Sequence, residues 1–133
     1  MLKYKIITID LYRHTIVSCI GDWETFIQWF KEISEFGEAY DSFKSIINEN
    51  KPLELGKCYT NSTGDSIILV KPWNNIKELS NLVHETGHAA ISLLEYIGCP
   101  INWQSDEAFT YLQEYIFREC VTDDGYVTYN KPE

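Results

Sequence analysis

The longest predicted helix of the chain lies between Asn75 and Gly98, in the stretch N-I-K-E-L-S-N-L-V-H-E-T-G-H-A-A-I-S-L-L-E-Y-I-G. Its start can be capped by Asn74 or Asn75, and Gly98 can end it in a left-handed conformation. Apolar side chains recur on one face at helical spacing. They are Leu79, Leu82, Val83, Ala90, Leu93, Leu94 and Ile97. This face is expected to pack against the core.

A second long helix is predicted after a short connection. Pro100 prevents an immediate restart of the first helix, and Ser105 or Asp106 can cap a new helix that runs to about Val121. The connection is short, so the two helices are expected to lie side by side and antiparallel.

The remainder of the chain predicts a small sheet. Residues 3–20 read as two strands that turn near Arg13 and His14, and 57–60 with 66–70 read as a hairpin around Asn61 to Asp65.

Two further helical segments and a tail complete the pattern. Asp22 can cap a helix that reaches Glu35 and ends at Gly37, and a short helix is expected from Ser42 to Asn48. The polar tail from Thr122 onward is expected to be loose. Together the segments predict one α+β domain over residues 1–133, with a small mixed or antiparallel sheet against the two long helices.

Composition limits the possible partners and compartments. Twenty acidic and 11 basic residues give a formal charge of −9, which disfavours nucleic acid as a partner. We expect no membrane span, because no apolar run approaches the required ~20 residues. The four cysteines show no C-x-x-C spacing, and without a signal-like N-terminus we expect free thiols and a cytoplasmic protein. The oligomeric state stays open.

The segment H-E-T-G-H, from His84 to His88, indicates chemistry. Histidines four residues apart lie on one helix face about one turn apart, so both imidazoles can reach one Zn²⁺ ion. Glu85 points about 100° away around the helix and can act as general base on a water at the fourth position.

A catalytic zinc ion takes a third protein ligand, and the sequence offers several. Glu107 is the preferred one, because it stands early in the next helix, 19 residues after His88. The alternatives are His14, far upstream, with Glu95 and Glu114 weaker still. Glu107 can also be explained as an acidic residue favoured in a first helical turn.

These residues resemble the gluzincin branch of zincin metallopeptidases. H-E-T-G-H followed by S-D-E-A-F-T-Y-L, with eighteen residues between His88 and Glu107, is similar to the spacing of the aminopeptidase N group. The resemblance covers about residues 66–120. It implies a minimal zincin-like domain with His84, His88 and Glu107 as zinc ligands and Glu85 as base. A segment like G-A-M-E-N is missing, so the resemblance does not extend to exopeptidase specificity.

The expected function is therefore a zinc metallohydrolase, specifically a peptidase acting on peptide or protein substrates. The alternative is a zincin-like metal-binding module that regulates or binds a partner without cleavage. Tyr111, one turn after Glu107, is the expected oxyanion donor, although Tyr59, Tyr115 and Tyr126 are also possible. The strand at 66–70 can be either the edge strand that pairs with substrate or a plain core strand.

Overall fold

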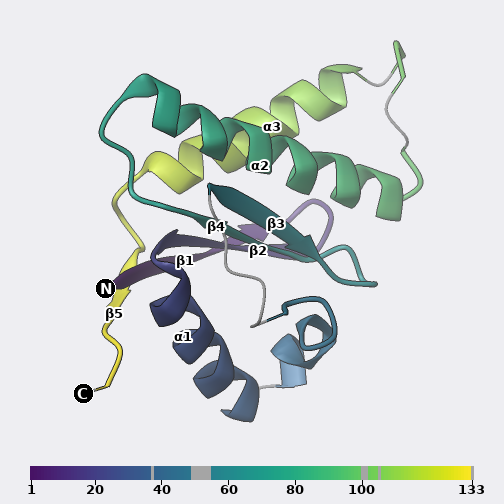
Figure 1. The fold of residues 1–133 in the computed structure, drawn as a ribbon. Helices are drawn as coiled ribbons and strands as arrows, with labels where there is room; N and C mark the ends of the chain where they lie inside the picture. Colours follow the sequence, from purple (N-terminus) through teal and green to yellow (C-terminus); the bar gives the residue numbers. More distant parts are fainter. Residues whose placement is uncertain (37, 49–54, 100–101, 105, 133) are drawn as a thin grey trace.

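A computed structural model describes residues 1–36, 38–48, 55–99, 102–104 and 106–132. The predicted α+β class is confirmed, since a five-stranded mixed sheet carries three α-helices and a 3-10 helix (Figure 1). The strands are β1 Leu2–Ile9, β2 His14–Gly21, β3 Gly56–Thr60, β4 Ser66–Val70 and β5 Val127–Tyr129. The helices are α1 Trp23–Phe36, η1 Glu38–Phe43, α2 Ile76–Tyr96 and α3 Asp106–Val121.

The strand order is β3-β4-β2-β1-β5. Strands β2 and β4 run parallel, and the other neighbours are antiparallel. Both predicted hairpins are confirmed, and Arg13, with φ 55°, takes the left-handed conformation in the first turn. Strand β4 is paired on both sides, so the sequence 66–70 forms a core strand. The edge strand is β3, one strand further out.

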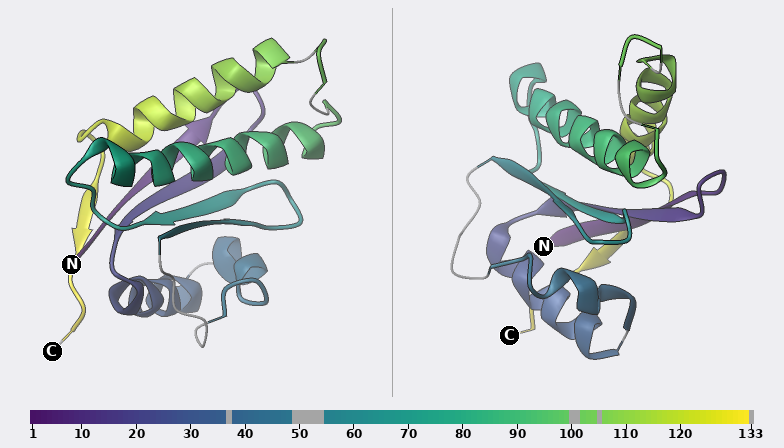
Figure 2. Two further views of the ribbon diagram at one scale, coloured as in Figure 1. Left: turned by 45° about the horizontal axis from the view of Figure 1, so that its top comes forward. Right: turned by 90° about the vertical axis from the view of Figure 1, so that its right-hand side faces the viewer.

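The sheet separates two helical layers, as Figure 2 shows: α2 and α3 lie on one face, and α1 with η1 lies on the other. Every residue of β4 is buried, which explains the apolar run I-I-L-V from Ile67 to Val70. Ile68 and Val70 pack in the core under α2 and α3, whereas Ile67 and Leu69 join the aromatic core around Phe26 on α1. Alternate residues of one strand therefore hold both layers on the sheet.

The predicted limits of the long helices are confirmed. The side chain of Asn75 accepts a 2.8 Å hydrogen bond from the backbone N–H of Glu78 at the start of α2. Gly98 follows the helix with φ 81°, a conformation that favours glycine. At α1, Asp22 accepts a 2.8 Å bond from the backbone N–H of Thr25. None of the described helices combines the length and apolar character that a membrane crossing requires.

Two expectations are wrong, both outside the long helices. The expected helix from Ser42 to Asn48 is one turn, closed by the 2.9 Å bond from the N–H of Ile47 to the carbonyl of Phe43, after a 3-10 helix. Burying these two side chains in the α1 core requires only one turn. The tail is also ordered, because β5 pairs with the open edge of β1. The expected roles of Gly37 and Ser105 fall on positions outside the described residues.

Candidate metal centre

The two histidines of the motif converge on the exposed face of α2. His84 and His88 bring their Nε2 atoms to 3.0 Å from each other, with ring centroids 4.6 Å apart and planes nearly perpendicular. Two nitrogens that share a tetrahedral zinc ion at ~2.05 Å would lie about 3.3 Å apart. The helix alone therefore gives the imidazoles nearly the spacing that a single ion requires. The side chain of His84 is 70% exposed, so an ion can reach it from solvent.

Glu85 lies on the neighbouring side of the helix, toward the edge strand. Its residue is only 7% exposed, and its Oε1 atom is 4.0 Å from Nε2 of His84. A Cβ atom added to Gly56 on β3 would lie 3.5 Å from Cγ of Glu85, so the strand passes directly beside this carboxylate. A buried carboxylate next to exposed imidazoles is placed to accept a proton at the rim of the site.

The environment of Glu85 changes its acidity. Desolvation by burial raises the pKa of the carboxyl group above its usual value. The nearby His84, His88 and Lys57 and a hydrogen bond from the backbone N–H of Cys58 lower the pKa and offset part of this effect. A raised pKa brings a carboxylate closer to the range in which it exchanges protons at neutral pH.

One cluster among the described residues could hold a metal ion. His84, Glu85 and His88 each offer a donor atom, and all of these atoms lie within 4.8 Å of one another. Glu107, the predicted third ligand, is described but lies outside this cluster, exposed in the first turn of α3. The structure therefore brings together the histidine pair and the base, but not the predicted third ligand.

The packing of α3 on α2 accounts for the position of Glu107. The side-chain amide of Gln113 donates a 3.1 Å hydrogen bond to the carbonyl of Val83. The same amide lies over Gly87, where an added Cβ atom would be 3.2 Å from Nε2 of Gln113. Glu107 precedes Gln113 by six residues, about 9 Å along the axis and about 120° around it. Gln113 is a residue that the sequence analysis missed, and the small Gly87 inside the motif was the available signal.

The alternative ligands also lie outside the cluster. Both ring nitrogens of His14 face backbone carbonyls, those of Tyr12 and Thr63, and its ring packs edge-on against Tyr96. Glu114 pairs at 3.7 Å with Arg118 on its own helix. Glu95 is exposed near the end of α2 and is not grouped with the histidines.

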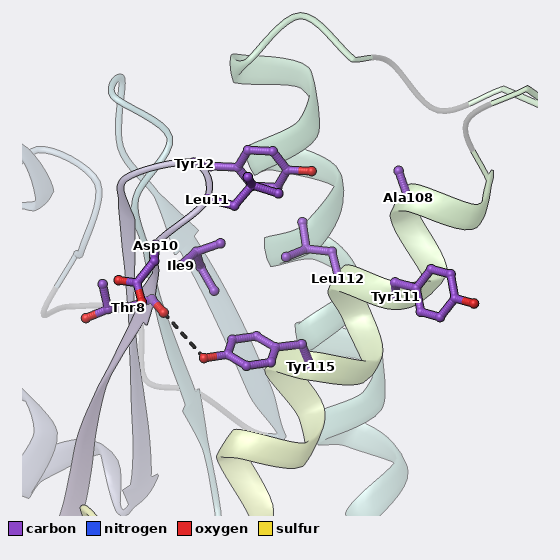
Figure 3. A pocket seen from close by; sticks show the side chains of 9 residues that line it. All are labelled: Thr8, Ile9, Asp10, Leu11, Tyr12, Ala108, Tyr111, Leu112 and Tyr115. Atoms are coloured by element: carbon purple, nitrogen blue, oxygen red, sulfur yellow. Dashed lines mark hydrogen bonds between the residues drawn. The ribbon is translucent and has the colours of Figure 1, made fainter.

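Tyr111 projects from a different side of α3. It lines a groove of about 480 Å³ between this helix and the turn after β1, where the hydroxyl of Tyr115 donates a 3.4 Å hydrogen bond to the carbonyl of Thr8 (Figure 3). Residues two apart on a helix face away from each other, so Tyr111 and the α2-contacting Gln113 point in nearly opposite directions. The role of Tyr111 as oxyanion donor stays a prediction.

The other two tyrosines considered for this role are engaged elsewhere. Tyr59 is buried in the aromatic core under α1, and burial raises its pKa to about 12. The hydroxyl of Tyr126 donates a 2.6 Å hydrogen bond to the carbonyl of Cys120.

Strand β3 gives the candidate site an open backbone edge. Its residues pair with β4 on one side only, and in the described sheet no strand lies on the other side. Because the N–H of Cys58 donates to Glu85, the backbone groups of this residue face away from β4 and toward the proposed base. An exposed edge of this kind can pair with an extended peptide.

Comparison of the chain with protein-family models, with characterised proteins and with solved structures gave no significant match. The resemblance to gluzincins therefore rests on the sequence motifs, and the geometry supports only the His-Glu-x-x-His part of it.

Proposed function

We propose that this protein is a zinc-dependent metallohydrolase of the zincin type, specifically a metallopeptidase of the gluzincin branch. The observation that carries the proposal is the convergence of His84, Glu85 and His88, with 3.0 Å between the two Nε2 atoms and the carboxylate buried beside them. A purely structural pair of histidines would not require a glutamate at this position.

Each group of the proposed site would have one role in the hydrolysis of a peptide bond. A bound zinc ion supplies Lewis acidity, which activates a water molecule and polarises a substrate carbonyl. Glu85 accepts the proton from the attacking water and passes it to the leaving nitrogen. In the proposed complex His84, His88 and Glu107 would hold the ion, which requires the carboxylate of Glu107 to move toward the histidines from its exposed position in α3.

The substrate class follows from the strand beside the base. The open edge of β3 would align an extended peptide or protein segment antiparallel or parallel to Gly56–Thr60, with a scissile carbonyl near Glu85. Nucleic acid is not proposed, because the formal charge of −9 repels a phosphate backbone. The four cysteines are free thiols in the structure, which agrees with the proposed reducing, cytoplasmic location.

A second candidate function has a specific observation in its favour. The described donor cluster holds only one glutamate, Glu85, and this residue is the intended base. A module that binds metal or a partner without cleavage would need no further ligand from α3. The alternative function is therefore a non-catalytic, regulatory module that binds metal or a partner.

Metal binding is the first test. We expect the purified protein to bind one zinc ion per chain by elemental analysis and calorimetry, and His84→Ala to weaken binding at least tenfold. Glu107→Gln should also weaken zinc binding. Glu95→Gln, an exposed position on α2, is the matched control and should not change zinc binding.

Asp106→Asn distinguishes between two possible third ligands. Asp106 stands seven residues before Gln113, so on an ideal helix it lies almost in line with Gln113, on the side facing α2. Loss of binding in Asp106→Asn alone would transfer the third-ligand role from Glu107 to Asp106.

Cleavage is the second test. A mixed library of unstructured peptides, analysed by mass spectrometry, should be cut by the zinc-loaded protein. Glu85→Gln should bind zinc as the wild type does and lose cleavage by about a hundredfold or more. If no peptide is cut by the zinc-loaded wild type, the non-catalytic reading replaces the peptidase. If no zinc binds, both fail.

A further inference from the structure

A second cavity lies at the other end of the helical layer. It encloses about 340 Å³ where β1, the segment before α2 and the end of α3 come together. Figure 1 shows the start of α2, the end of α3 and the N-terminus at this same end of the molecule. The volume is within the range of small-molecule sites, ~300–1,000 Å³. Its described lining includes none of the metal-centre residues.

The floor of this cavity is fixed by hydrogen bonds. The hydroxyl of Tyr126 donates to the carbonyl of Cys120 at 2.6 Å and lies 2.6 Å from Oγ of Ser18. The buried Lys5 donates to the carbonyl of Glu119 at 2.9 Å, and its Nζ lies 5.6 Å from the centre of the Tyr126 ring. These contacts hold the end of α3 and the aromatic wall in place, so a ligand would meet a preorganised surface.

Two opposite charges line this cavity without a partner. Neither the ammonium of Lys3, on β1, nor the carboxylate of Asp123, just after α3, has an ion-pair partner in the described part of the chain. Asp123 also lies beside the negative end of the α3 dipole, which reinforces its preference for a cation. Trp73, Tyr126 and Ile20 add an apolar wall.

The charges decide which ligand fits. A simple anion would meet Lys3 but also the carboxylate of Asp123, in a protein of formal charge −9. A simple cation would be attracted by Asp123 but would leave Lys3 without a partner. A molecule that carries both charges can pair with both groups, and a flat apolar part can pack on the aromatic wall.

We propose that this cavity binds a free α-amino acid with an aromatic or large apolar side chain. The ammonium group lies at Asp123, the carboxylate at Lys3, and the side chain against Trp73 and Tyr126. The site is separate from the metal centre and does not depend on the proposed peptidase activity.

The test compares three compounds that differ in one charge each. The metal-free wild-type protein, held in EDTA, is titrated with L-phenylalanine, its methyl ester and N-acetyl-phenylalanine, and binding is followed by the indole N–H signals in NMR spectra. Trp73→Phe identifies the signal of Trp73. We expect saturable binding of phenylalanine that shifts this signal, and binding of each analogue to be weaker by about fivefold.

Variants then assign each charge to its residue. Lys3→Met should bind phenylalanine and its methyl ester equally well, and Asp123→Asn should lose the discrimination against the N-acetyl compound. Asp124→Asn is the matched control, because this exposed neighbour does not line the cavity, and it should keep both preferences. Circular dichroism confirms that each variant is folded. No saturation at millimolar phenylalanine, or equal binding of the three compounds to the wild type, overturns the proposal and leaves the metal-centre proposal untouched.

Discussion

Gly87→Ala tests the close contact between α2 and Gln113 of α3. In a helix interior, replacing glycine by alanine stabilises the folded state by about 1 kcal/mol. Here the added Cβ would lie 3.2 Å from Nε2 of Gln113, closer than an ordinary contact. The amide must therefore move by a few tenths of an ångström, which weakens its 3.1 Å hydrogen bond to the carbonyl of Val83. Losing such a bond costs roughly 0.5–1.5 kcal/mol.

The two effects oppose each other, so we expect Gly87→Ala to change the free energy of unfolding by less than ~0.5 kcal/mol in the wild type. In a Gln113→Ala background there is no amide to displace, and the same substitution should stabilise the protein by the full ~1 kcal/mol. The assay is urea unfolding of the four proteins of this double-mutant cycle in EDTA.

The expected coupling between positions 87 and 113 is thus about 1 kcal/mol. A strong destabilisation by Gly87→Ala in the Gln113→Ala background would refute the reasoning, because it would mean that backbone or another side chain, rather than the amide of Gln113, occupies the space beside Gly87.

The cap of α2, the buried Glu85 and the thiol of Cys58 can each be tested by one measurement. Asn75→Ala should destabilise the protein by about 1 kcal/mol in urea unfolding through loss of the helix cap, whereas Asn74→Ala, whose side chain caps nothing, should have little effect. In EDTA, Glu85→Gln should become more stable than the wild type as the pH rises. Burial raises the pKa of Glu85 in the folded state, so ionisation of this group costs folding free energy in the wild type. The difference should grow above the unfolded-state pKa and become constant above the folded-state pKa. Burial raises the pKa of the Cys58 thiol to about 11. At pH 8 this thiol should therefore react with a thiol reagent roughly a hundredfold more slowly than a free cysteine, as measured by peptide mass spectrometry. Reaction at the rate of a free cysteine would contradict its burial.

The parts of the fold that follow from local rules were predictable from the sequence. Helix α2 starts at a cap residue and ends at a glycine, and its apolar face has helical spacing, so its limits needed no tertiary information. The hairpin of β3 and β4 is similar, because two β-prone runs flank a short polar turn.

The parts that depend on distant partners were not predictable. Nothing in the run S-I-I-L-V says whether its second edge is covered, and only the parallel pairing with β2 makes β4 a core strand. The tail appears polar and loose in sequence, yet the open edge of β1 provides a partner for Val127 to Tyr129. Burial of Phe43 and Ile47 against α1 likewise replaced a predicted helix with a single turn.

The candidate metal centre likewise has a part that the sequence predicts and a part that depends on tertiary packing. The spacing of His84 and His88 is a property of one helix, so the sequence alone predicts that their nitrogens can meet. The third ligand depends on how α3 is rotated about its own axis. That rotation buries Leu112 and Ile116 in the core and places Gln113 against Val83 and Gly87. A glutamate six residues before Gln113 is turned about 120° from this contact, whatever its distance along the sequence from His88. Spacing between motifs therefore leaves the third ligand to be decided by the packing of the second helix and by its movement on metal binding, which Glu107→Gln and Asp106→Asn test.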